Sequence, residues 1–254
     1  MQENNYLPMQ IIKLNATEST NAYLKELLAE VALKDFTVVV ASEQSKGRGQ
    51  MGTLWESEPG KNLTFSVLKR FDNFLVSNQF MINVLVSMAL YEHLKKLHIP
   101  DLCVKWPNDI LSGHHKIAGI LIENILSGDK IQSSVIGIGL NVNQIHFNNL
   151  PNVSSLKLIS GKNLDLEELL TSLLETMGEL FEILKSKSPA KEKALLEKYK
   201  SVLFRKDKPS TFRNENDQLF MGFITDVSSE GKLIITLEDG IKKEFGLKEI
   251  KLLY

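Results

Sequence analysis

The stretch Gly47-Arg48-Gly49-Gln50-Met51-Gly52 has the GxGxxG spacing of a dinucleotide-binding loop, but the residues after it do not suit that fold. In a dinucleotide-binding unit the glycines open a helix, because the pyrophosphate binds at the helix N-terminus. Here residues 53–61 carry proline, glycine and mixed charge with no helical period, and residues 62–68 form a β-rich run. The order strand, glycine loop, strand therefore argues against the dinucleotide fold and favours an arginine-bearing loop that handles an anion.

The composition is that of a soluble globular protein. The 254 residues are 43% apolar and 24% charged, and the net charge of -1 gives no electrostatic case for a nucleic-acid or membrane partner. This length favours one main domain with a small second one. Residues 1–15 lack a leader pattern and no long apolar run occurs, so a cytoplasmic location is expected.

The single cysteine, Cys103, excludes an intramolecular disulfide and a cysteine-built zinc site, in agreement with a reducing compartment. Its neighbours Leu102 and Val104 predict a buried strand thiol, and a catalytic thiol is the alternative. The pair His114-His115 is interpreted as a loop tip rather than a metal site, because adjacent strand residues point to opposite faces. His93 and His98 are expected to be exposed.

Apolar periodicity predicts the main elements. A first helix runs through residues 24–31 with Ser19 or Thr20 as its N-cap. Further helices cover 77–97, 165–181 and 193–202, and Asp165 caps the helix at 165–181. The predicted strands are 36–41, 62–68, 102–105, 117–123 and 134–140, with a hairpin turn at 127–130.

The sequence pattern changes near Phe204. From there on it predicts short strands, with tight turns at 228–231 and 238–240. About fifty residues of this kind suggest a small barrel. The predicted division is a catalytic domain over residues 1–203 and a small β domain over 204–254.

A second informative stretch is Lys105-Trp106-Pro107-Asn108-Asp109, with Lys116 seven residues beyond the aspartate. The Trp-Pro pair ends a strand and leaves Asn108 and Asp109 as polar groups at its exit. A lysine that opens the next strand, near a carboxylate and the arginine loop, could hold a carboxylate or phosphate. Taken alone, the same lysine could simply be solvated.

Five ordered motifs together resemble the catalytic domain of biotin-protein ligases over most of the chain. They are residues 18–21 (ESTN), 43–52 (EQSKGRGQMG) with Trp55, 105–109 (KWPND), 116–121 (KIAGIL) and 137–143 (GIGLNVN). The tail is similar to the SH3-like domain of that family. The resemblance implies an α/β (α+β), class II synthetase-like catalytic domain with a mixed sheet, followed by an SH3-like barrel.

The resemblance also implies a reaction. Biotin and ATP, with Mg²⁺, would give biotinyl-5′-AMP and pyrophosphate, and the biotinyl group would pass to a lysine of a biotin carboxyl carrier domain. No prosthetic group is expected, and the protein would be a monomer or homodimer. With no helix-turn-helix segment ahead of residue 15, a form without the DNA-binding domain is expected.

The resemblance assigns residue roles in this sequence. Lys116 and Arg48 are the catalytic candidates, since both would neutralise the meeting anions. The biotin and adenylate site would comprise Ser19, Thr20, Asn21, Gln44, Gly47, Arg48, Gly49, Gln50, Trp55 and Lys116. The nucleotide site would comprise Trp55, which would pack over the adenine, with Asn108, Asp109 and Asn141, and Asp109 is the candidate Mg²⁺ ligand. Alternatively, Ser19 only caps a helix, Trp55 anchors a loop and Asn141 is a turn residue.

Gln50 departs from the family pattern, in which many members carry arginine at this position. A neutral amide offers no charge, so retention of the adenylate is expected to be weaker. Thr53, where a basic residue is frequent, lowers the positive charge of the loop further. The rival functions are a lipoate or octanoyl ligase or transferase and a non-catalytic carrier-binding or biotin-sensing module. Trp106-Pro107-Asn108-Asp109 beside the glycine loop favours biotin, and Lys116 favours catalysis.

Overall fold

The computed structural model describes residues 9–147 and 150–254, so residues 1–8 of the predicted catalytic domain lie outside the described part. The elements before the small β domain are β1 (Ile11–Thr17), α1 (Thr20–Glu30), β2 (Val38–Gln44), η1 (Gln50–Gly52), β3 (Leu63–Leu75), η2 (Val76–Asn78), α2 (Gln79–Lys96), β4 (Leu102–Lys105), β5 (Asp109–Ser112), β6 (His115–Ser127), β7 (Lys130–Leu140), α3 (Leu156–Ser160), α4 (Leu166–Lys185) and α5 (Pro189–Ser201).

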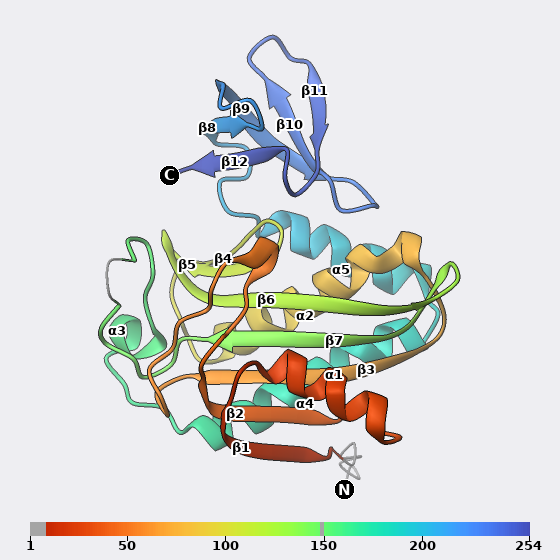
Figure 1. Ribbon diagram of the computed structural model, residues 1–254. Coiled ribbons are helices and arrows are strands. Elements are labelled where there is room, and N and C mark those ends of the chain that lie inside the picture. The colour runs from red at the N-terminus through yellow and green to blue at the C-terminus, as the bar shows by residue number, and fades with distance from the viewer. Residues whose placement is uncertain (1–8, 148–149) are drawn as a thin grey trace, which may run out of the picture.

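These strands form one mixed sheet of seven, in the order β1-β2-β3-β7-β6-β5-β4. Only β1 and β2 pair in parallel, while the other neighbours are antiparallel. Helix α1 covers one face, and α2, α4 and α5 pack together on the other (Figure 1). The mixed α/β fold is confirmed. The sheet is not the parallel one of a dinucleotide fold, and only the three residues of η1 are helical in the glycine loop.

The larger core lies between the sheet and α2, α4 and α5, and a smaller cluster built on Leu24, Val39 and Leu68 lies under α1. Helix α2 is buried on most of its circumference because it lies between the sheet and the other two helices. His93 on α2 is therefore only 4% exposed, so the prediction that it is exposed was wrong.

The predicted helices are confirmed, and so are their caps. Ser19 caps α1 by accepting from the backbone N–H of Ala22, and Asp165 caps α4 by accepting from Glu167 and Glu168. The predicted strand at 36–41 begins later, at Val38, because Phe36 has a left-handed φ of 64°.

Besides the short turns η1 and η2, the strands β1 and β5 and the helix α3 were not predicted. Asp109 is the first residue of β5, and it pairs in register with Lys105 of β4. Residues 106–108 thus form a tight hairpin tip between two strands. This hairpin fixes where Asn108 and Asp109 lie.

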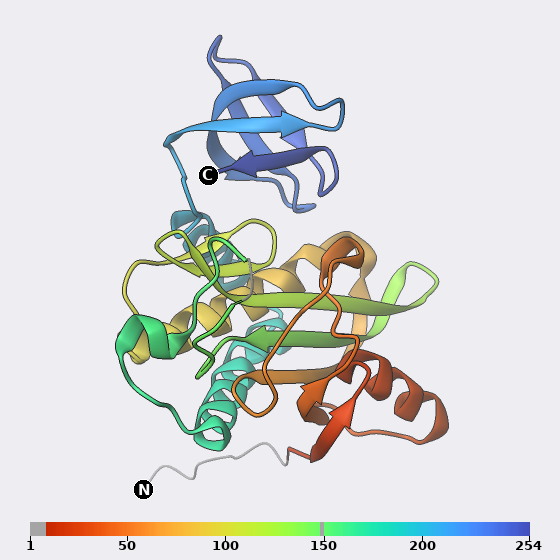
Figure 2. The same cartoon turned by 60° about the vertical axis from the view of Figure 1, so that its left-hand side comes forward.

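The second sheet is antiparallel, in the order β11-β10-β9-β8-β12. Its strands are β8 (Pro209–Asn214), β9 (Leu219–Val227), β10 (Leu233–Leu237), β11 (Lys242–Phe245) and β12 (Ile250–Leu253). On this sheet the buried Phe212 stacks against Phe220, and Phe220 stacks against Phe245, both of which are partly buried. The small β unit lies beyond the β4–β5 end of the main sheet (Figures 1 and 2).

The small β unit is joined to the rest of the chain by specific contacts. The indole N–H of Trp106 donates to the carbonyl of Gly231, at 2.9 Å, and Lys200 of α5 pairs with Asp226 of β9, also at 2.9 Å. A Cβ on Gly231 would overlap the ring of Phe80, so this approach requires glycine. The barrel is thereby held against the end of the main sheet.

No helix in the described part of the chain is both long and apolar enough to cross a membrane.

Candidate functional site

A cleft of about 1070 Å³ runs from the N-terminus of α1, past the β5–β6 hairpin, to the barrel. Most of the predicted site residues line it: Ser19, Thr20, Asn21, Gln44, Arg48, Gly49, Gln50, Trp55, Asn108, Asp109 and Lys116. They come from segments up to about a hundred residues apart, and the sheet brings them together.

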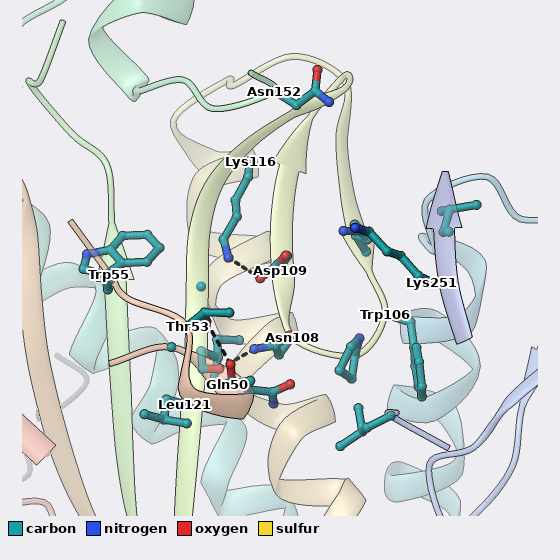
Figure 3. Close-up of a pocket in the computed structure, with 18 of the residues that line it drawn as sticks. Gln50, Thr53, Trp55, Trp106, Asn108, Asp109, Lys116, Leu121, Asn152 and Lys251 are labelled. Atoms are coloured by element: carbon teal, nitrogen blue, oxygen red, sulfur yellow. Dashed lines mark hydrogen bonds and ion pairs between the residues drawn. The ribbon is translucent and has the colours of Figure 1, made fainter. Parts of the chain in front are cut away.

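The cationic end of the cleft is built on the β5–β6 hairpin. The Nζ of Lys116 lies 2.7 Å from Oδ1 of Asp109, and the two side chains are 30% and 17% exposed (Figure 3). The backbone of Lys116 is held by residues 152–154, because its N–H donates to the Asn152 carbonyl and its own carbonyl accepts from Ser154. The predicted proximity of Lys116 to a carboxylate is confirmed.

Asn108 lies at the tip of the β4–β5 hairpin and is 9% exposed. Its Nδ2 donates to the carbonyl of Ile120 on β6, and its own carbonyl accepts from the N–H of Ile120. The side-chain amide is therefore held against β6. Asn108 fixes the wall of the cleft beside Asp109.

The glycine loop folds back on itself above this wall. Arg48 and Leu54 form an isolated antiparallel bridge, and the N–H of Gly49 donates to the carbonyl of Thr53 at 2.7 Å. A Cβ on Gly47 would overlap the backbone of Trp55, so the tight approach requires glycine. Gly47 supports the loop, and among the described residues it is not part of the cleft lining.

The indole of Trp55 lies against two strands of the sheet. A Cβ on Gly139 of β7 would overlap it, a Cβ on Gly119 of β6 would lie 3.1 Å from it, and the Nζ of Lys116 is 5.5 Å from the ring centroid. Its Nε1 is buried and has no hydrogen-bond partner among the described residues. The glycines form a floor without side chains, which brings an aromatic ring or a ligand close to the backbone.

The neutral end of the cleft lies under α1. The Oε1 of Gln44 accepts from the backbone N–H of Thr20 at 2.8 Å, and the Nδ2 of Asn21 donates to Glu123 on β6 at 2.8 Å. Glu123 also pairs with Lys25, at 2.6 Å. Hydroxyls and amides face this end, whereas the charges of Lys116 and Asp109 lie at the other.

A search with protein-family models matches residues 14–141 to the biotin/lipoate A/B protein ligase family. The chain belongs to this family. It is 29% identical over 212 residues to the bifunctional ligase/repressor BirA of Bacillus subtilis, covering 82% of this chain and 63% of that protein. It is 28% identical over 243 residues to the BirA of Escherichia coli, covering 94% and 73%. The chain thus spans less than two thirds of the length of the Bacillus relative.

Among solved structures, the biotin protein ligase of Aquifex aeolicus in complex with biotin and ATP superposes with a TM-score of 0.76. It is 28% identical to this chain, and the match covers 96% of this chain and 98% of that one. The resemblance to biotin-protein ligases that the five motifs indicated is confirmed.

Two features of this family member differ from the expected site. Asn141 is 2% exposed and lies outside the described cleft lining. Its Nδ2 donates to the Ser154 carbonyl and its own carbonyl accepts from Leu156, so it holds residues 154–156 against the end of β7. Its Oδ1 is buried and has no hydrogen-bond partner among the described residues. The role of Asn141 in nucleotide binding stays a prediction.

The second feature is the barrel side of the cleft, which the sequence did not indicate. Arg213, Lys248, Lys251 and Tyr254 line it. The Tyr254 ring packs at 4.9 Å from Phe204, and the Nζ of Lys105 lies 4.9 Å from the Tyr254 ring. No local signal distinguishes these residues, because their place depends on how the barrel docks. The Gly-x-Gly pattern of β7 was a signal for the floor, since glycine inside a strand marks a close approach.

The remaining candidates have structural surroundings. His114 packs edge-on against Phe204, in agreement with a loop tip that contacts its neighbours. The Cys103 thiol is half-buried, and burial raises its pKa to about 11, which keeps it protonated. A protonated thiol is a poor nucleophile, so the interpretation of Cys103 as a structural residue is supported.

Proposed function

We propose that the chain is an ATP-dependent biotin-protein ligase that forms biotinyl-5′-AMP and transfers the biotinyl group to a lysine of a biotin carboxyl carrier domain. The observation that carries this proposal is the Lys116–Asp109 pair, placed between a glycine floor and the arginine loop within one cleft. The Aquifex relative, whose structure contains biotin and ATP, supports the choice of substrates.

The first step joins two anions. A carboxylate oxygen of biotin forms a bond to the α-phosphorus of ATP, and the bond from that phosphorus to the bridging oxygen of pyrophosphate breaks. Like charge opposes this approach, so cations must neutralise the carboxylate and the phosphate. Lys116 lies in the cleft wall and Arg48 on the loop above it, which allows both to reach the meeting atoms.

Mg²⁺ is expected to enter with the phosphates of ATP, as their counter-ion. No group of three metal-ligating side chains occurs in the described chain, and the cleft lining holds two separate carboxylates, Asp109 in the wall and Asp217 on the barrel side. Mg²⁺ commonly takes one or two carboxylates and completes its shell with phosphate oxygens and water, so this donor set fits a substrate-borne ion. When bound, it would add positive charge at the phosphates.

The second step needs no covalent bond to the protein. The lysine amine of the carrier attacks the carbonyl carbon of the adenylate, AMP leaves with the electrons of the C–O bond, and the nitrogen loses a proton. The cleft is lined on one side by the arginine loop and on another by the barrel, and we expect the carrier lysine to enter between them.

The test is transfer of labelled biotin to an apo carrier domain by the full chain. Transfer is expected with biotin and ATP together and is expected to be absent with either alone. The family model also covers lipoate ligases, so lipoate and octanoate are offered in parallel, and preferential transfer of either would replace biotin as the substrate. Binding of biotin without pyrophosphate release would instead favour the non-catalytic sensing module.

A further inference from the structure

Ser66 is a buried serine on β3 that lies behind the neutral end of the cleft. Its side chain is inaccessible to solvent, and among the described residues it is not part of the cleft lining. Its Oγ nevertheless lies 2.6 Å from Oδ1 of Asn21 and 2.7 Å from Oγ1 of Thr20, two residues that do line the cleft. Ser66 therefore connects two site residues from the rear.

The orientation of the Asn21 amide decides the direction of these bonds. Its nitrogen donates to two groups that can only accept, the carbonyl of Leu121 at 3.3 Å and the carboxylate of Glu123 at 2.8 Å. The oxygen of the amide must then face Ser66. A Cβ on Gly137, which pairs with Ser66 across β3 and β7, would overlap that amide, so its place is also sterically defined.

A hydroxyl has one hydrogen, so Ser66 can donate only once. The Asn21 oxygen cannot donate, and Ser66 must therefore give its hydrogen to Asn21. The hydrogen of Thr20 has two acceptors within reach, Ser66 Oγ at 2.7 Å and Gln44 Oε1 at 3.1 Å. Two hydroxyl oxygens at 2.7 Å need a hydrogen between them, so the shorter contact takes the hydrogen of Thr20. With its hydrogen turned to the rear, Thr20 presents only lone pairs to the cleft.

The neighbours of Thr20 present the opposite polarity. Gln44 turns its Oε1 to the backbone N–H of Thr20, so its NH₂ group remains for the cleft side. The Ser19 oxygen accepts from the N–H of Ala22, at 3.5 Å, which leaves the Ser19 hydrogen free to donate. The neutral end thus offers two donors and one acceptor side by side.

We propose that Ser66 is a positioning residue that sets the hydrogen-bond polarity of Thr20 and so selects a ligand carrying an N–H beside a carbonyl. A cyclic urea has this pattern, with a carbonyl oxygen to accept from Ser19 and Gln44 and an N–H to donate to Thr20. This inference rests on the proposed function, in which the ureido head of biotin lies at the neutral end and its carboxylate lies by Lys116. Buried polar groups that are fully paired reject a ligand that leaves one of them unpaired.

The test is calorimetric titration of the full chain with biotin and with two analogues, in each of which one ureido N–H is replaced by oxygen. For wild type, at least one analogue should bind about tenfold or more weakly, because two lone pairs would face each other at Thr20. In Ser66→Ala the hydrogen of Thr20 is no longer held at the rear, and it can turn either to Gln44 Oε1, 3.1 Å away, or to the analogue. Biotin should then bind more weakly than it does to wild type. The ratio of the biotin affinity to the affinity of the discriminated analogue should fall to within about threefold.

The matched control is Ser134→Ala on β7. Ser134 is equally buried and donates to an asparagine oxygen, that of Asn124, also at 2.6 Å, but it lies outside the described cleft lining. This variant should keep the wild-type ratio. Ser66→Cys keeps the side-chain volume close to that of serine with a weak donor, so it should give an intermediate ratio even if the alanine variant does not fold.

An unchanged ratio in a folded Ser66 variant, or equal affinities of wild type for biotin and both analogues, would overturn the positioning role while leaving the ligase proposal intact. Failure of the wild-type chain to bind biotin at all would instead overturn the proposed function itself.

Discussion

The ammonium of Lys116 lies 2.7 Å from the carboxylate of Asp109, across the β5–β6 hairpin, and 5.5 Å from the centroid of the Trp55 ring. Seven residues separate the pair in sequence, and the hairpin turns them toward one another in the cleft wall. A lysine held in this way keeps its charge at a fixed place. The pair therefore offers a cation for the approach of two anions without first ordering a free side chain.

Replacing Lys116 with alanine should slow adenylate formation by about 10²–10³-fold, because its charge matters most as negative charge gathers at phosphorus. The dissociation constant of biotin should rise by less than about tenfold. Pyrophosphate release at saturating substrate and calorimetry measure the two effects. Lys198→Ala is the control, since that lysine pairs with Glu92 outside the described cleft lining. Equal losses in binding and rate would count against the role.

Replacing Gln50 with arginine should retain biotinyl-5′-AMP longer. Gln50 lies in the loop over the cleft, where its backbone carbonyl accepts from the hydroxyl of Thr53 and its side chain carries no charge. A cation there should lower the dissociation rate of the adenylate by about tenfold, as one charge-assisted hydrogen bond is gained. The rate is followed by release of labelled adenylate into solution. Gln132→Arg, on exposed β7 surface, adds the same charge elsewhere and should change nothing.

Gly139→Ala should displace the indole of Trp55, since the added Cβ would overlap the ring. We expect weaker ATP binding and a change in tryptophan fluorescence. In the double variant with Trp55→Ala the overlap is gone, so the added methyl should cost nothing beyond Trp55→Ala alone. A coupling energy of at least about 1 kcal/mol is expected from the cycle. Strict additivity would show that the ring does not lie on this floor.

His93 should make the fold sensitive to mild acid. Burial on α2 lowers its pKa from 6.5 to about 4, so the neutral form is favoured in the folded state. The contribution of His93 to the free energy of unfolding is fully present above pH 6.5 and is lost between pH 6.5 and 4. Over that range the unfolded chain takes up a proton that the folded chain does not. The loss should reach about 1–2 kcal/mol by pH 5.

Urea unfolding at pH 7.5 and pH 5 measures this loss. His93→Leu should flatten the difference between the two pH values, whereas His98→Leu, at an exposed position, should leave it as in wild type. The same pH dependence in wild type and His93→Leu would assign the acid sensitivity to other groups.

Cys103→Ala should leave ligation unchanged within about twofold, because a thiol with a pKa of about 11 is protonated at neutral pH. The folded protein should also react slowly with iodoacetamide at pH 8, and urea should speed the reaction. Rapid alkylation that abolishes activity would restore the alternative of a catalytic thiol.

The predictable part of the fold was local. The caps at Ser19 and Asp165, the turn at 127–130 and the strand on either side of the glycine loop follow from residue types a few positions apart. The strand β5 was missed because a strand of four residues depends on its partner more than on its own propensity. His93 was misjudged for the same kind of reason, since helix α2 is covered by elements far away in sequence.

The site likewise divides into features that local sequence predicts and features that depend on distant parts of the chain. Sequence alone determined the type of loop at residues 47–52, the lysine and carboxylate of the β5–β6 region, and the family, because these are carried by residue identity and spacing. Only the tertiary structure decided that Ser66 lies behind Thr20 and Asn21, and that Trp106 donates to Gly231, 125 residues away. Backbone geometry encodes local elements, whereas a distant partner is set by strand register and domain packing, which no local pattern records.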